Sequence, residues 1–273
     1  DERQWTWMDE GLNTFVQYMA QQAWEENYPQ SRGEPRAIVD YMRSKNQVPI
    51  MTNSESLLQF GNNAYSKPAA ALNVLRETVL GRELFDFAFR EYAQRWKFKR
   101  PTPADFFRTM EDASGTDLDW FWRGWFYTTD AVDVSVDGIT EYGISSKNPE
   151  TEKALQRARR ADEPVSVTDQ RNKGMARRVD SQPELKDFYN EHDDFTVTNK
   201  DRNKYNETME TLEDWEKALL AQGKHLYLVD FTNVGGLVTP LVLEIELKSG
   251  KKYIERVPAE VWRMSSKKIT KLI

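Results

Sequence analysis

The sequence predicts a multidomain α+β protein in which helices come first and strands come last. Apolar residues recur at spacings of three and four through the first 130 residues, whereas residues 223–273 alternate between apolar and polar side chains. Residues 145–222, between these two regions, are polar and highly charged. We therefore expect a helical part at residues 1–131, a strand plus charged, mostly helical connecting segment at 132–222, and a β-domain at 223–273.

The first helices are marked by their apolar faces and by residues that start or stop a helix. Residues 10–24 carry one apolar face, and a second, short face begins at Ile38. Residues 48–64 are irregular and rich in Asn, Ser and Gln, which predicts a long connecting loop. Pro68 then fits the first position of a helix that ends at Gly81.

The rest of the helical part shows the same kinds of signal. Residues 84–92 carry an apolar face, and residues 102–105, TPAD, form a capped helix start with an acid three residues after the threonine. Gly115 should end that helix, and residues 117–126 form a dense aromatic segment. Seven of the nine tryptophans lie before residue 126, so we expect the main core there.

Strands are expected on both sides of the charged segment. Residues 132–137 alternate Val with polar residues, which predicts a strand with one solvated face. Later strands are expected at residues 225–232, 241–247, 252–257 and 269–273, with a tight antiparallel turn at Gly250. For residues 145–222 we favour exposed helices with a solvated face over a binding patch. Self-association through these mixed charges is the alternative, and salt-sensitive oligomerisation would test it.

Composition excludes several classes of protein and of site. The net charge of -6 argues against nucleic-acid binding, and the absence of Cys excludes disulfides and thiolate metal sites. No apolar run reaches the ~20 residues of a transmembrane helix. The N-terminal residues DERQ lack the features of a signal peptide, so we expect a cut or processed piece whose targeting signal lies elsewhere.

The most informative stretch is residues 7–15, WMDEGLNTF. Taken alone, Asp9 and Glu10 are acids in the first turn of a helix, where the helix dipole favours them. The stretch resembles the W-x-x-E-G-x-x-x-(F/Y) signature of gluzincin aminopeptidases of the aminopeptidase N type. That resemblance implies that Glu10 is the third protein ligand to a catalytic zinc, facing two histidines on another helix.

A second element of the same family lies at residues 64–68, AYSKP, which resemble Tyr-x-Lys-Gly with Pro68 in place of the glycine. The resemblance implies that the Tyr65 hydroxyl donates to the oxyanion of the tetrahedral intermediate. The alternative is a tyrosine that only packs before a helix. Further landmarks follow in family order through about residue 130. Residues 233–262 resemble, less specifically, the β-domain that follows the catalytic domain in some bacterial members.

The resemblance also implies a fold and a limit on activity. It implies the helical C-terminal lobe of a thermolysin-like peptidase domain, then the charged segment, then a partial antiparallel β-sandwich-like domain. The family's first two zinc ligands come from His-Glu-x-x-His, but this chain has only His192 and His225, both outside such a motif. Counting back from Glu10 places the motif upstream of Asp1, so we expect this chain alone to bind no catalytic zinc and to be inactive.

Two functions remain open. The first is a fragment of a zinc metallo-aminopeptidase that hydrolyses N-terminal peptide bonds of a peptide substrate with metal-activated water. The second is a catalytically inactive peptidase-like scaffold or protein-interaction module. The joint presence of Glu10 and Tyr65 favours the enzyme, and reading the sequence upstream of Asp1 would decide. The resemblance further suggests an exported or cell-envelope protein.

Overall fold

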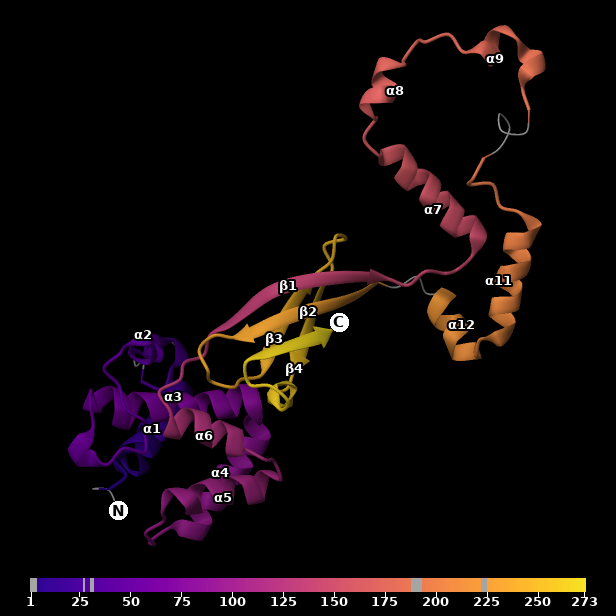
Figure 1. Cartoon of the computed structure of the whole chain (residues 1–273). Coiled ribbons are helices and arrows are strands. Elements are labelled where there is room, and N and C mark those ends of the chain that lie inside the picture. The colour runs from indigo at the N-terminus through magenta and orange to yellow at the C-terminus, as the bar shows by residue number, and fades with distance from the viewer. Residues whose placement is uncertain (1–3, 27, 30–31, 188–192, 222–224) are drawn as a thin grey trace. The chain divides into compact units, whose positions relative to one another are not determined.

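The computed structural model describes residues 4–26, 28–29, 32–187, 193–221 and 225–273. Contacts divide the chain into two units: residues 1–138 with 229–271, and residues 139–228 with 272–273 (Figure 1). Helices combined with antiparallel strands confirm the expected α+β class. The domain boundaries expected near residues 131 and 222 stay a prediction.

The N-terminal part of the first unit is helical. Its α-helices are α1 (Glu10–Trp24), α2 (Val39–Arg43), α3 (Lys67–Val74), α4 (Arg82–Trp96), α5 (Pro103–Ser114) and α6 (Asp119–Tyr127). Short 3-10 helices lie at Thr6–Met8, Pro35–Ile38 and Ser54–Ser56, and π-helical turns lie at Gly61–Ser66 and Leu75–Val79.

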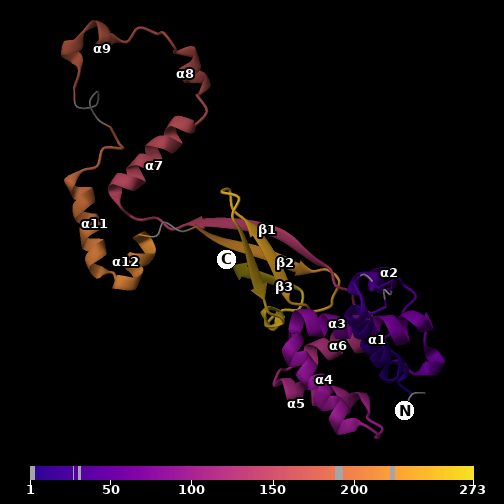
Figure 2. The same cartoon turned by 180° about the vertical axis from the view of Figure 1, so that it is seen from behind.

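An aromatic core holds these helices together, as the distribution of tryptophans predicted. α1, α3 and α6 lie together in both views of the chain, and α4 packs along α5 (Figures 1 and 2). The buried aromatic residues of this core include Trp7, Phe15, Phe85, Phe106, Phe121, Trp122, Trp125 and Phe126. Burial of each such ring stabilises the fold by roughly 1.5–3 kcal/mol, so this cluster is the main source of stability in the helical part.

The sequence predicted both ends of α5 correctly. The Thr102 backbone NH donates to the Asp105 carboxylate at 2.8 Å, and the Asp105 NH donates back to the Thr102 hydroxyl. Gly115 ends the helix in the left-handed conformation, with φ 64°. Both features follow from the sequence because they depend only on residues near each helix end.

The segment before Pro68 differs from the expected loop. The π turn Gly61–Ser66 runs directly into α3, so Pro68 lies inside a continuous helical run and is not its first residue. A proline ring normally crowds the carbonyl four residues earlier, here that of Ala64. The wider π turn in front of it provides a physical reason why the helix tolerates Pro68. The early start is stabilised by the buried Asn63 amide, which donates to the Val48 carbonyl at 2.8 Å.

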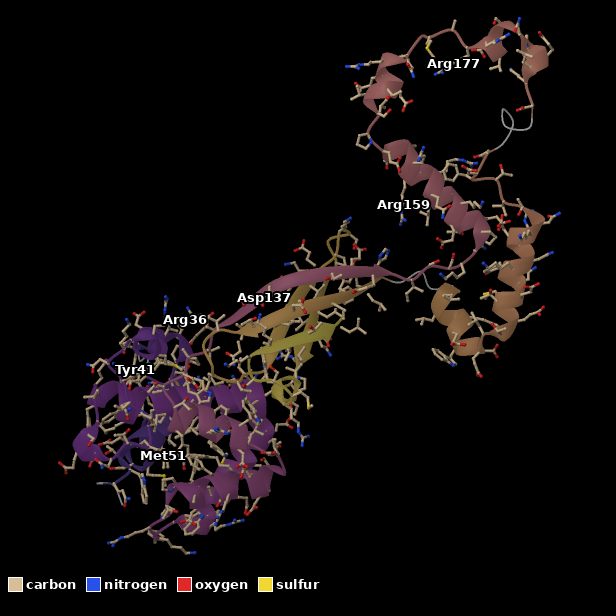
Figure 3. The ribbon with its side chains drawn as sticks, in the orientation of Figure 1. Arg36, Tyr41, Met51, Asp137, Arg159 and Arg177 are labelled. Atoms are coloured by element: carbon tan, nitrogen blue, oxygen red, sulfur yellow. The ribbon has the colours of Figure 1, made fainter. Side chains whose placement is uncertain are left out.

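The strands form two sheets. One contains β1 (Val134–Gly143), β2 (His225–Asn233) and β5 (Lys268–Leu272) in the order β1-β2-β5. The other is the antiparallel ladder of β3 (Leu241–Glu246) and β4 (Lys252–Val257). The late strands match their predicted positions, but β1 extends well beyond residue 137. In Figure 3, Asp137 projects from β1, where it accepts hydrogen bonds from Ser135 and Thr232.

The second unit contains the charged segment. Its helices are α7 (Pro149–Asp162), α8 (Val167–Arg171), α9 (Arg178–Ser181), α11 (Asn199–Thr211) and α12 (Asp214–Ala221), with a 3-10 turn at Pro183–Leu185. Arg202 of α11 pairs with Glu150 of α7 at 2.8 Å. Arg159 and Arg177 are exposed, as expected for a solvated face (Figure 3). Within the described residues, every helix is too short or too polar to span a membrane.

Candidate active site

Glu10 is the first residue of α1, and buried Trp7 fixes where that helix begins. The Trp7 indole is fully buried, and its ring centroid lies 5.8 Å from that of Phe107 and 4.7 Å from that of Phe126. The Thr14 hydroxyl donates to the Glu10 carbonyl at 2.6 Å. The half-buried Glu10 side chain therefore starts from a backbone position that the aromatic core holds rigidly.

Tyr65 lies in the π turn Gly61–Ser66. Asn63 in the same turn is fully buried, and its amide also donates to the Tyr41 hydroxyl at 3.3 Å, so the turn is tied to α2 (Tyr41 is labelled in Figure 3). The Tyr65 ring is partly exposed beside Phe60, with centroids 6.1 Å apart. π turns are frequent at functional sites because they displace one side chain from the regular helical register.

Gly11 lets α1 approach this turn closely. A Cβ on Gly11 would lie 2.6 Å from Pro68 Cγ and 3.1 Å from the Ala64 carbonyl oxygen. Any larger residue would force the two segments apart. Gly11 follows Glu10, and Ala64 precedes Tyr65, so this contact sets the spacing between the two predicted site residues.

The structure brings Glu10 and Tyr65 together. Hydrogen bonding to the Glu10 carboxylate is the main cause that raises the pKa of the Tyr65 hydroxyl, with desolvation and the charge of Glu10 acting in the same direction. The positive charge of Arg32 opposes this shift. The phenol therefore stays protonated at neutral pH and can donate a hydrogen bond.

Two further features of this region were not predicted from the sequence: the position of Arg32 and the burial of Lys67. The Arg32 guanidinium lies 5.0 Å from the centroid of the Tyr65 ring, although no motif marked it. Lys67 belongs to the Tyr-x-Lys element, yet nothing in that pattern indicated that it is fully buried. Lysines are rarely buried completely, so its burial could be recognised only in the folded protein.

The two histidines do not enlarge this site within the described residues. His225 Nδ1 lies 2.7 Å from Glu141 Oε1, between neighbouring strands β2 and β1. His192 lies outside the described residues. The His225 ring therefore already has a carboxylate partner on the neighbouring strand.

One acidic group in the described chain has the spacing of a metal site, and it does not include Glu10. It consists of Glu111, Asp117 and Asp119. Glu111 accepts from the Leu118 NH at 2.9 Å, and Asp117 accepts from the Asp119 NH at 3.1 Å. These acids cap the start of α6, which accounts for their position without an ion.

Comparison with known proteins identifies the helical part. Residues 2–125 match the peptidase family M1 domain. The helical part of the chain is therefore similar to the peptidase family M1 domain. The M1 match includes both Glu10 and Tyr65, and it confirms the family resemblance that the sequence motifs predicted.

The chain is also 28% identical, over 149 residues, to "Probable aminopeptidase 1" of Sulfurisphaera tokodaii. That match covers 49% of this chain and 19% of the relative. The matched region thus spans less than a quarter of the relative's length. No solved structure matches this chain.

Proposed function

We propose that this chain is part of a zinc-dependent aminopeptidase that removes N-terminal residues from peptides. The observation that carries the proposal is the meeting of Glu10 and Tyr65 within a segment of the M1 peptidase family. The same proposal assigns the helical part to the C-terminal lobe of a thermolysin-like domain. It assigns the strands to a partial β-sandwich-like domain.

The position of Glu10 fits that of a zinc ligand. Its carboxylate is half-buried next to a neutral phenol, and carboxylate oxygens are common zinc ligands. A single carboxylate is one of the three protein ligands that a catalytic zinc needs. The other two would be the histidines of a His-Glu-x-x-His motif upstream of Asp1. Zinc, when bound, would supply an activated water and polarise the scissile carbonyl.

Tyr65 would stabilise the negative charge that develops on the substrate. Its hydroxyl is kept protonated and would donate to the carbonyl oxygen as that oxygen becomes an oxyanion. Before reaction, Glu10 holds the hydroxyl as its hydrogen-bond acceptor. A single donor of this kind contributes about 10²–10³-fold to kcat in other enzymes.

The test uses a polypeptide in which this chain follows an intact His-Glu-x-x-His motif. We expect Glu10→Ala to lose stoichiometric zinc, and Tyr65→Phe to keep zinc but lower kcat by about 10²–10³-fold. Tyr253→Phe, at an exposed tyrosine of β4, is the matched control and should change neither. Full zinc binding by Glu10→Ala, or undiminished kcat in Tyr65→Phe, would refute the assignment.

Three further proposals accompany this function. The chain without the upstream motif is expected to hold no catalytic zinc and to lack peptidase activity; stoichiometric zinc together with activity would overturn that expectation. An exported or cell-envelope location would be tested by fractionating cells that produce the whole protein. Self-association through residues 145–222 would appear as oligomers that dissociate as salt is raised.

A further inference from the structure

Lys67 is a buried cation next to the proposed catalytic tyrosine. Its side chain is 0% exposed, and its Nζ donates to the Thr128 carbonyl at 3.4 Å. Burial lowers the pKa of Lys67 to about 8, while the negative charge of Asp130 acts in the opposite direction. Because a buried ammonium group is costly, an apolar residue of similar size would be the simpler choice for packing alone.

The backbone on either side of Lys67 belongs to the site. Tyr65 lies two residues before it in the π turn, and Pro68 follows it directly. Pro68 is also the residue that α1 contacts through Gly11. A displacement of Lys67 would therefore move Tyr65 relative to Glu10.

The partner segment of Lys67, residues 128–131, is held firmly at its start. The Thr128 hydroxyl donates to the Gly124 carbonyl at 2.8 Å and accepts from the Asp130 NH at 3.1 Å. The Gln47 amide donates to the Thr129 carbonyl at 3.3 Å. These bonds fix the chain where α6 ends, so the acceptor of the Lys67 ammonium has little freedom to move.

The same segment is held at its end by the turn after β2. The Ala131 NH donates to the Gly235 carbonyl at 2.9 Å, and the Ala131 carbonyl accepts from the Leu237 NH at 3.2 Å. Gly236, with φ 88°, lies against the Asp130 carboxylate, where a Cβ would be 3.0 Å from Oδ1. Residues 128–131 are thus braced by the β-strand part as well as by α6.

We propose that Lys67 is a positioning residue that ties the Tyr65 turn to residues 128–131 and thereby holds the Tyr65 hydroxyl at Glu10. The inference rests on the proposed role of Tyr65. Lys67 acts through the backbone that carries Tyr65, and its Nζ bonds to the Thr128 carbonyl. The β-strand part supports the site through the same connection.

The first test reports on Tyr65 directly and needs no activity. 3-Fluorotyrosine is placed at position 65 of the 273-residue chain and its 19F resonance is measured in wild type, Lys67→Met and Asp130→Asn. We expect both substitutions to shift or broaden the resonance. Lys97→Met, at an exposed lysine that ends α4, is the control and should leave it unchanged. An unchanged resonance in a folded Lys67→Met or Asp130→Asn chain would overturn the proposal.

The second test uses the polypeptide with the intact upstream motif. Lys67→Met should lower kcat by about 10- to 100-fold, the cost of a misplaced catalytic group, with KM within about twofold and zinc content unchanged. Combined with Tyr65→Phe it should cause no further loss, because both changes remove the same interaction. Full additivity of the two losses would overturn the proposal.

The two tests separate this inference from the proposed function. If Tyr65→Phe keeps full kcat, the catalytic role of Tyr65 is wrong, while the 19F resonance still decides whether Lys67 positions that side chain. If Lys67→Met does not fold, Asp130→Asn replaces it in both tests, because Asp130 is only partly buried. Its losses should be smaller than those of Lys67→Met and in the same direction.

Discussion

Replacing Lys67 with Met should change how the stability of this chain depends on pH. Burial lowers the pKa of Lys67 from 10.5 to about 8 in the folded chain. Between those values the unfolded chain holds a proton on Lys67 that the folded chain has released, so the free energy of unfolding rises with pH. At ~1.4 kcal/mol per pH unit, the wild type should gain roughly 3 kcal/mol relative to Lys67→Met between pH 8 and 10.5.

Urea unfolding, followed by tryptophan fluorescence, measures this difference at pH 7, 8, 9, 10 and 10.5. Subtracting the free energy of unfolding of Lys67→Met from that of the wild type removes the contribution of every group that titrates alike in both chains. Below pH 8 the difference should be flat, because Lys67 is protonated in both states. In Asp130→Asn the rise should begin at lower pH, since the charge that favours the protonated lysine is gone. If the difference in free energy of unfolding stays flat to pH 10.5, or falls, the conclusion that burial lowers the pKa of Lys67 is wrong.

Other substitutions test the packing and electrostatics of the helical part. Gly11→Ala should lower the free energy of unfolding by roughly 1–3 kcal/mol because its Cβ would lie 2.6 Å from a ring carbon of Pro68 in α3. Thermal unfolding measures this loss, and Gly143→Ala, whose Cβ would have no atom within 4 Å, is the control. Thr102→Ala removes the capping box of α5 and should cost ~1 kcal/mol in urea unfolding, whereas an unchanged midpoint would contradict the cap. Hydrogen bonds from Arg76 hold the pKa of Asp86 below its usual value, so their stabilisation is present above pH 4 and is lost as pH falls through the lowered pKa. Arg76→Gln should remove at most about 1 kcal/mol after solvent screening, and an acid-unfolding midpoint no higher than that of wild type would argue against the pair.

Elements specified by neighbouring residues were predictable from the sequence. α1 spans residues 10–24 as expected, and the Thr102 cap and Gly115 stop were both located from their residue types. Elements that depend on distant contacts were not. The π turn at Gly61–Ser66 has no periodic pattern of its own and is stabilised by Asn63 bonding to the carbonyl of Val48. The extension of β1 was missed because its outer half, including Tyr142, is exposed and pairs with a strand far along the chain.

In the candidate site, too, local features were predictable from the sequence and long-range contacts were not. Glu10 and Tyr65 were found through motif resemblance, because their residue types and spacing are local properties. Their proximity depends on the contact of Gly11 with Pro68, which joins segments more than fifty residues apart. The sequence motif includes Lys67, but the burial of Lys67 depends on how α6 and the chain after it cover α3. The candidate site residues could thus be predicted from short sequence patterns, whereas the tertiary contacts that hold them in place could not.

The pairing of β1 with β2 has a consequence for how this chain can vary. The Ser135 hydroxyl oxygen lies 3.5 Å from the Thr232 carbonyl oxygen, and Glu141 accepts from the hydroxyl of Tyr227, so the two strands run antiparallel. The chain between Gly143 and His225 is therefore an insertion between two neighbouring strands of one sheet. Loop-closure entropy grows only slowly with length, so such an insertion can lengthen or shorten at little thermodynamic cost. A two-residue Asn-Gly turn in its place should close the hairpin and leave the strand register and the helical part intact.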